Sequence, residues 1–294
     1  MTYDVIIIGG SYAGMSAAFP LLRARRRVLI VDGGKRRNRF ASHSHGFLTQ
    51  DGVAPDVIAA QAGVQLAAYP TLTWLEGNAM DANRRDDGFT VTLEDGRDFS
   101  SRRLILAHGI TDNLPEISGL QERWGQSVFH CPYCHGYELN QGKIGVIGVA
   151  PMSMHQALML PDWGQVTFLP NGTFEPDAAA LAQLDARGTA LETTRIAEVT
   201  GKADVRLVDG RLLSFDGLFV ASIVSPSSPI AERLGCAFDD LPNGRQIVTD
   251  DMQHTGVRHV FACGDAARAA GSVPLAVGDG TMAGTACHKS LMFD

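Results

Sequence analysis

Two cysteines three positions apart, Cys131 and Cys134, are the residues of this sequence best suited to chemistry. A pair at this spacing can close a small disulfide ring, and a helix that started here would favour the reactive thiolate. The odd total of five cysteines argues against a structural disulfide framework, so the pair predicts thiol–disulfide exchange. The other three have small and apolar neighbours and are interpreted as buried side chains: Cys236, Cys263 and Cys287.

Histidines flank the pair, His130 before it and His135 after it, and they open two other interpretations. CxxCH is the attachment pattern of c-type haem, and haem attachment requires export from the cytoplasm. The sequence opens on Asp4 and a short apolar run rather than on a basic export signal. We therefore expect a cytoplasmic protein. Zinc could use both cysteines and both histidines, but adjacent residues point apart and no second pair supplies further ligands. We therefore expect neither haem nor a metal site.

A dinucleotide-binding pattern occupies the start of the chain. The β-branched run 5–8 leads through a turn at 9–14 into the Ala-rich stretch 15–22, which is typical of strand, turn and helix. A second apolar run, 28–31, ends in Asp32 and completes a βαβ unit.

The turn of this unit has small residues where a pyrophosphate must approach the backbone, namely Gly9, Ser11 and Gly14. Amide groups at the start of the helix would hold the phosphates. Asp32 can accept hydrogen bonds from ribose hydroxyls and would repel a 2′-phosphate, so this site suits FAD or NAD.

A second βαβ unit follows the cysteines, with a strand at 143–148, a helix at 152–160 and a strand at 165–169. Only Gly148 remains of its glycine turn, and residues 170–173 contain no Arg to pair with a 2′-phosphate. Each lost charge-assisted bond is worth about 1.5 to 3 kcal/mol, so two would weaken binding about a hundredfold or more. We expect NADPH to be excluded or weakly bound.

Three segments resemble the FAD signatures of the low-molecular-weight thioredoxin reductase family: the Gly9 turn, the Ala-His-Gly at 107–109 and the Phe-Ala-Cys-Gly-Asp at 261–265. His108 stands where that family usually has Thr. The Cys-Pro-Tyr-Cys-His-Gly-Tyr-Glu stretch at 131–138 resembles a narrower group, the flavin-dependent dithiol oxidases of the gliotoxin and holomycin pathways. The reductases usually carry Asp after the second Cys, where this chain has His135.

The resemblance implies that Cys134 faces the flavin, that Cys131 exchanges with the substrate sulfur and that His135 carries the proton. An imidazole whose pKa stays near neutral suits that task. The resemblance also implies that Asp265 binds the flavin ribitol. The residues expected to bind FAD are Gly9, Gly10, Ser11, Ala13, Gly14, Asp32, Gly33, Arg37, Asn38, His45, Ala82, Ala107, His108, Gly109, Gly264, Asp265, Ser272 and Val273.

The elements predict an α/β protein of two Rossmann-like domains, doubly wound and of the three-layer ββα type, the second inserted in the first. A chain of 294 residues has room for two such cores. We expect an FAD-binding domain at 1–113 and 241–294, and a degenerate NAD(P)H-binding-like domain at 114–240 that carries the cysteine pair. Further expected elements are helices at 55–68 and 278–291 and strands at 89–93, 104–107, 218–224 and 257–263.

Charge and hydropathy exclude some partners. The formal net charge of −7 opposes nucleic-acid binding, and no apolar run approaches the roughly 18 residues of a membrane span. Two basic clusters, 25–27 and 35–39, could contact a cofactor phosphate or could simply be solvated.

The leading hypothesis is a homodimeric FAD-dependent dithiol oxidase. A small-molecule or peptide dithiol would reduce the Cys131–Cys134 disulfide, and the electrons would leave through FAD to O2 as hydrogen peroxide. One alternative is a reductase of thioredoxin or a small disulfide, fed by NADPH or ferredoxin. Another is a flavin-binding redox sensor without turnover.

Overall fold

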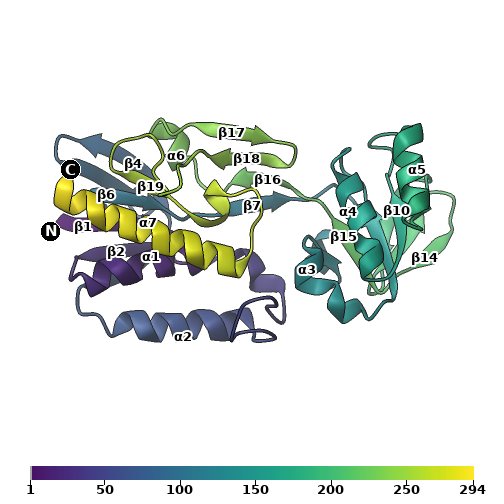
Figure 1. The fold of residues 1–294 in the computed structure, drawn as a ribbon, viewed down its shortest axis with the longest axis horizontal. Helices are drawn as coiled ribbons and strands as arrows, with labels where there is room; N and C mark the ends of the chain where they lie inside the picture. Colours follow the sequence, from purple (N-terminus) through teal and green to yellow (C-terminus); the bar gives the residue numbers. More distant parts are fainter. Residues whose placement is uncertain (1) are drawn as a thin grey trace. The chain divides into compact units, whose positions relative to one another are not determined.

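The computed structural model describes residues 2–294, which form two compact units (Figure 1). Unit 1 comprises the chain up to Arg37, Pro55–Thr111 and Ser225–Asp294. Unit 2 comprises Asn38–Ala54 and Asp112–Val224. Each unit is built on its own largely parallel sheet, so the α/β class with two Rossmann-like units is confirmed.

The main sheet of unit 1 has the order β3-β2-β1-β6-β5-β4, with β19 beside β6. The strands β1, β2, β3, β6 and β19 run parallel, whereas β5 pairs antiparallel with both β4 and β6. The carboxyl ends of β1, β2, β6 and β19 therefore meet at one edge, where a doubly wound sheet binds its ligand. The strands are β1 (Thr2–Ile8), β2 (Val28–Asp32), β3 (Leu72–Glu76), β4 (Ala79–Arg85), β5 (Gly88–Leu93), β6 (Asp98–Leu106) and β19 (Val260–Ala262).

Helices α1 (Tyr12–Arg23) and α7 (Val273–Phe293) lie side by side (Figure 1), and α2 (Pro55–Ala67) also contacts α1. Their close approach depends on two glycines of α7, because a Cβ at Gly280 would collide with the carbonyl oxygen of Ala13 and one at Gly284 with that of Ala17. Ser272 caps α7 by accepting a hydrogen bond from the Leu275 amide at 3.4 Å, so the helix begins earlier than the predicted residue 278.

One core cluster of unit 1 lies on one face of the parallel sheet. Alternate residues of β1, such as Ile6 and Ile8, pack there with Phe89 and Val91 of β5. Residues of the later part of the chain, including Ile230 and Ile247, complete this cluster. They belong to α6 (Ile230–Arg233) and to a four-stranded sheet of order β17-β18-β16-β7, formed by β17 (Phe238–Leu241), β18 (Gly244–Ile247), β16 (Ile223–Pro226) and β7 (Ile110–Asn113).

Unit 2 contains the parallel sheet β11-β10-β9-β15-β8 and an antiparallel sheet β12-β13-β14. Hydrophobic side chains of β8, β9, β10 and β15 pack against α4 and α5 in a buried cluster. The elements are β8 (Val128–Phe129), α3 (Pro132–His135), β9 (Lys143–Ile147), α4 (Ser153–Met159), β10 (Gln165–Leu169), α5 (Ala178–Ala186), β11 (Ala190–Leu191), β12 (Ile196–Thr200), β13 (Asp204–Leu207), β14 (Leu212–Ser214) and β15 (Gly217–Val220).

The structure differs from one further expected strand, and its compact units divide the chain at other positions than the expected domains. The single strand predicted at 218–224 is interrupted, because the Ser222 amide turns back to donate to the Val220 carbonyl at 3.0 Å between β15 and β16. The units change after Thr111 and after Val224, against the expected 113 and 240, since β16 to β18 pair with β7 in one sheet. Segment 38–54, expected in the first domain, groups with unit 2.

Candidate active site

The glycine turn of unit 1 is built for the close approach of a ligand. Gly9 has a φ of +104°, and a Cβ there would collide with the carbonyl oxygen of Ala107. A Cβ at Gly14 would in turn collide with the carbonyl oxygen of Gly9. The first hydrogen bond of α1 runs from the Met15 amide to the Ser11 carbonyl at 2.9 Å, so the amides before Met15 face out of the start of the helix, where they suit an anion.

Asp32 lies at the end of β2, beside this turn. Its Oδ1 accepts a hydrogen bond from the Gly10 amide at 3.0 Å, which fixes the carboxylate at the mouth of the turn. The chain thus brings together the turn and the acid that the sequence predicted, 22 residues apart. A carboxylate in this place can accept hydrogen bonds from a ribose.

His108 follows β6 and has one buried nitrogen without a protein partner. Its Nδ1 lies 3.0 Å from the Gly109 carbonyl oxygen, so Nδ1 must carry the proton and donate. Burial lowers the pKa of His108 to about 4, which keeps the ring neutral at pH 7. The Nε2 atom is buried and has no hydrogen-bond partner among the described residues. A bound group that donates a hydrogen bond would satisfy it.

The Phe-Ala-Cys-Gly-Asp segment also meets the glycine turn. Gly264 has a φ of +69°, and a Cβ added there would lie 2.7 Å from the Cβ of Ala13 in α1. Asp265 is held by Arg37, whose Nη1 donates to its Oδ2 at 3.0 Å. The pair places an ordered carboxylate next to the first helix of the cradle.

The remaining residues expected at the FAD site are divided between the units. Ala107 lies in unit 1 against Gly9, and Gly33 follows Asp32 there, while Ser272 and Val273 form the start of α7. The side chain of Ala82 is packed in the unit 1 core at 3% exposure, which leaves only its backbone for a ligand. Asn38 and His45 belong to unit 2.

His45 has partners of its own within unit 2. Its Nε2 lies 3.4 Å from Glu138 and its Nδ1 lies 3.5 Å from Asp51. The structure therefore gives His45 two carboxylate partners. One of them, Glu138, is the last residue of the Cys-Pro-Tyr-Cys-His-Gly-Tyr-Glu stretch.

Three arginines of the basic cluster 35–39 have partners in the protein. Arg36 pairs with Asp56, Arg37 with Asp265, and the guanidinium of Arg39 lies 4.1 Å from the ring centroid of Phe40. The cluster 25–27 follows the carboxyl end of α1, at the opposite end of that helix from the glycine turn. It does not belong to the cradle.

The residues of unit 1 fit FAD. The turn has space where a Cβ would not fit, the outward amides suit a pyrophosphate, Asp32 suits a ribose, and His108 presents a buried acceptor without a partner.

The cysteine pair of unit 2 lies on one tight turn. Cys131 is the N-cap residue of α3, Pro132 is its first residue, and the Cys134 amide donates to the Cys131 carbonyl at 3.2 Å. Both cysteines are half-buried. The expected helix start is present, but α3 has only four residues, too few for a substantial helix dipole.

His135 is stacked on Phe129, with ring centroids 4.4 Å apart and planes 21° apart. Burial lowers the pKa of His135 to about 4, and this effect outweighs the opposing influence of Glu138. The near-neutral pKa that made His135 attractive as a proton carrier is thus replaced by that of a weaker base, neutral at pH 7.

His130 was not among the residues expected to act, and the structure gives it a network. Its Nδ1 lies 3.4 Å from the Ser222 hydroxyl, which lies 2.6 Å from Asp112 Oδ1. These three residues are far apart in the sequence, so no motif links them.

Polar groups at the second βαβ turn and after β10 form hydrogen bonds within unit 2. The Val149 amide, which follows Gly148, donates to the Ser153 hydroxyl at 3.0 Å, and Ser153 is fully buried. After β10, the Asn171 side chain accepts from the Ile196 amide at 2.8 Å and the Thr173 hydroxyl donates to the Pro170 carbonyl at 2.8 Å. These groups are therefore engaged within the unit rather than directed at a nucleotide.

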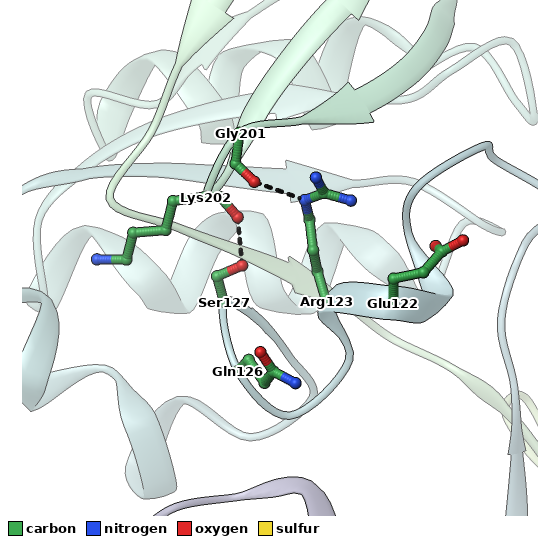
Figure 2. A pocket seen from close by; sticks show the side chains of 6 residues that line it. All are labelled: Glu122, Arg123, Gln126, Ser127, Gly201 and Lys202. Atoms are coloured by element: carbon green, nitrogen blue, oxygen red, sulfur yellow. Dashed lines mark hydrogen bonds between the residues drawn. The ribbon is translucent and has the colours of Figure 1, made fainter.

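An open polar pocket of about 400 Å³ also lies in unit 2 (Figure 2). Arg123 donates to the Gly201 carbonyl there at 2.9 Å, and the Ser127 hydroxyl donates to that of Lys202. The pocket contains none of the residues expected to act, and two of its side chains, Arg123 and Ser127, are engaged with backbone carbonyls. Its lining residues are Glu122, Arg123, Gln126, Ser127, Gly201 and Lys202.

Residues 2–294 also bear on other classes of function. In this part of the chain, three or more His, Cys, Asp or Glu side chains do not gather in a way that could hold a metal ion. None of the helices described here has both the length and the apolar character of a membrane span.

Comparisons with known proteins agree with this geometry. The sequence profile of the pyridine nucleotide-disulphide oxidoreductase family matches residues 3–280. The thioredoxin reductase tcpT of Claviceps purpurea (strain 20.1) is 34% identical over 99% of this chain and 95% of its own. A crystal structure of an oxidoreductase from Agrobacterium tumefaciens is 59% identical, with a TM-score of 0.97 over 100% of this chain and 99% of its own. The crystal structure of HlmI is 33% identical, with a TM-score of 0.92 over 99% of this chain and 93% of its own.

Proposed function

We propose that this chain, which belongs to the pyridine nucleotide-disulphide oxidoreductase family as an FAD-dependent disulfide oxidoreductase, works as a dithiol oxidase. Its substrate would be a small-molecule or peptide dithiol, its product the corresponding disulfide, and its electron acceptor dioxygen. We further propose that it acts as a homodimer in the cytoplasm.

The observation that carries this proposal is the contrast between the two βαβ turns. In unit 1 the turn leaves a cradle with an acid at its mouth, whereas in unit 2 Ser153 takes the amide that a pyrophosphate would need. A chain that holds FAD but binds NADPH weakly must receive its electrons elsewhere. The cysteine pair beside the degenerate turn offers that entry.

The proposed reaction begins with the oxidised pair. One substrate thiol loses its proton and its sulfur attacks Cys131, so the Cys131–Cys134 bond breaks, a mixed disulfide forms and Cys134 leaves as thiolate. The second substrate thiol then loses its proton and attacks the substrate sulfur of the mixed disulfide. The cyclic or linked disulfide departs, and Cys131 is released as the second reduced sulfur of the pair, while the substrate has lost two protons and two electrons.

FAD bound in unit 1 supplies the two-electron chemistry that returns the pair to the disulfide and delivers the electrons, with two protons, to dioxygen as hydrogen peroxide. Residues expected to hold it are the Gly9 turn, Asp32, His108 and Asp265. The protein thereby separates the binding of FAD from the exchange of thiols.

We assign His135 to proton transfer at Cys134. Its imidazole is neutral at pH 7 and can accept a proton there, but its pKa of about 4 makes it a weak base that releases the proton again at once. The negative charge of Glu138 raises the pKa of His135. Glu138 also lies 3.4 Å from His45, and His45 lies 3.5 Å from the exposed Asp51. This series of groups would lead protons to solvent.

One observation favours the alternative of an NADPH-fed reductase. The guanidinium of Arg195 lies beside Gly172, so that a Cβ at Gly172 would be 2.7 Å from its Nε. Gly172 follows β10, where a 2′-phosphate would be recognised in a working nucleotide site. Arg195 lies outside residues 170–173, which follow β10 directly.

The two functions differ in the electron donor, which is the dithiol substrate for the oxidase and NADPH for the reductase. The test is to measure peroxide and disulfide formed from a model dithiol in air without NADPH, for the wild type and for Arg195→Gln. The proposal expects about one peroxide per disulfide and equal rates in both proteins. Peroxide that forms only when NADPH is added, and that falls in Arg195→Gln, would establish the reductase instead.

A further inference from the structure

Three side chains of unit 2 form a hydrogen-bonded row that ends next to the first cysteine. Asp112 lies on β7, Ser222 in the break between β15 and β16, and His130 immediately before Cys131. The Ser222 hydroxyl donates to Asp112 Oδ1 at 2.6 Å, and His130 Nδ1 lies 3.4 Å from the same hydroxyl oxygen.

The single proton of the Ser222 hydroxyl fixes the protonation of His130. Because that proton goes to the Asp112 carboxylate, the hydroxyl oxygen can only accept from the imidazole. Nδ1 of His130 therefore carries the hydrogen in the neutral ring, and Nε2 carries the lone pair. The negative charge of Asp112, relayed through Ser222, also stabilises the imidazolium that forms when Nε2 takes a proton.

The row is held rigidly. Ser222 has 0% exposure, and the His130 carbonyl accepts a hydrogen bond from Gln156 Nε2 at 2.6 Å. Gln156 is itself 6% exposed on α4. His130 is thus fixed through its backbone by one buried residue and through its ring by another.

We propose that His130 is the base that takes the proton of the thiol reacting at Cys131, and that Ser222 and Asp112 are positioning residues that set its tautomer and basicity. The proposal deepens the function of the cysteine pair and rests on Cys131 being the substrate-facing thiol. It holds in either direction of electron flow.

The proton balance follows from the exchange steps. Nε2 of His130 takes the proton of the first attacking thiol as its sulfur bonds to Cys131 and Cys134 leaves as thiolate. When the second substrate thiol breaks the mixed disulfide, the imidazolium returns that proton to the departing sulfur of Cys131. The second substrate proton goes to solvent.

The two histidines beside the pair then have different tasks. The ring of His135 is stacked on Phe129, whereas that of His130 faces Ser222 with Asp112 behind it. Among the titratable groups, Asp112 from β7 reaches His130 through Ser222, and Cys131 follows His130 directly in the chain.

The test measures thiol reactivity rather than turnover. The holoenzyme is reduced with dithiothreitol under nitrogen, the reductant is removed, and alkylation of Cys131 by iodoacetamide is followed by mass spectrometry from pH 5 to 9. A thiolate paired with imidazolium reacts at lower pH. We expect His130→Gln, Ser222→Ala and Asp112→Asn to move the inflection upward by about one pH unit, which is about tenfold slower labelling at pH 7.

His155→Gln, an exposed histidine of α4, is the matched control and should label like the wild type. Asp112→Asn covers the case in which the buried Ser222→Ala fails to fold, and the flavin spectrum reports folding for each variant. Imidazole added to His130→Ala should restore labelling at pH 7. An inflection unchanged in His130→Gln and Asp112→Asn, with the spectrum intact, would overturn the proposal and would leave the question of oxidase or reductase untouched.

Discussion

The imidazole of His135 stacks on the phenyl ring of Phe129, with centroids 4.4 Å apart, directly after the second cysteine of the pair. Phe129 is 8% exposed and belongs to the core cluster of unit 2, so the stack ties the reactive segment to a rigid base. The same contact removes the ring from water, which lowers the pKa of His135 to about 4. The stack thus fixes the position of the His135 ring and also makes that ring a weaker base.

This lowered pKa predicts that acid destabilises the fold. An unfolded histidine binds its proton near its ordinary pKa of about 6.5, whereas folded His135 does so only near 4. Between these values the unfolded state holds more protons, so stability is lost as the pH falls through this window. His135→Phe keeps an aromatic partner for Phe129 and should flatten the fall of Tm between pH 6.5 and 4.5, while the exposed His155→Gln should not. Equal slopes in all three proteins would refute the assignment.

The glycine turn predicts a sharp effect of a single methyl group. Gly9→Ala places a Cβ against the Ala107 carbonyl at a φ of +104°, so we expect the purified protein to lose most of its flavin and several degrees of Tm. Gly63→Ala in α2 is the control, because a Cβ there meets nothing within 4 Å and a helical alanine is favoured by about 1 kcal/mol. The ratio of flavin to protein absorbance distinguishes them. Full flavin content in Gly9→Ala would contradict the cradle.

Asp32 predicts a graded loss of FAD affinity. A hydrogen bond to a charged group is worth about 1.5 to 3 kcal/mol, so Asp32→Asn should raise the Kd for FAD about 10- to 150-fold. Asp87→Asn, an exposed acid beside β5, removes the same charge away from the turn and should bind like the wild type. Titration of the apoprotein with FAD, followed by flavin fluorescence, measures both. Equal affinity in the two variants would mean that Asp32 does not contact the cofactor.

The order of the thiol steps predicts opposite behaviour for the two cysteine variants. Cys134→Ser leaves Cys131 able to exchange with an added disulfide, and the mixed disulfide should persist because its resolving partner is missing. Cys131→Ser should form no such adduct, and neither variant should turn over a dithiol. Intact-mass spectrometry after incubation with the oxidised model substrate provides the test. A stable adduct on Cys134 in Cys131→Ser would reverse the assigned roles.

Local patterns were sufficient to predict the cradle but not the network at His130. The run 5–8, the turn and Asp32 lie within one βαβ unit, where periodicity and glycine positions constrain the backbone directly. Ser222 lies 92 residues from His130 and 110 from Asp112, and it meets them only because the strand predicted there is interrupted at that point. Tertiary contacts of this kind leave no short-range signal.

His45 and His135 show the same limit. The sequence predicted His45 to bind FAD with the residues of the first nucleotide unit. In the structure its loop groups with unit 2, and its ring nitrogens lie near Asp51 and Glu138. The identity of His135 was predicted from the motif, but its lowered pKa depends on the packing of Phe129, which no motif records.

The most direct test of the central claim is anaerobic. The purified holoenzyme is mixed under nitrogen with a model dithiol or with NADPH, and the flavin absorbance is followed before air is admitted. The proposed oxidase predicts rapid bleaching by the dithiol alone, no comparable bleaching by NADPH, and recovery of the absorbance with peroxide when oxygen enters. Fast bleaching by NADPH, with reduced flavin that persists in air, would contradict it and identify a reductase.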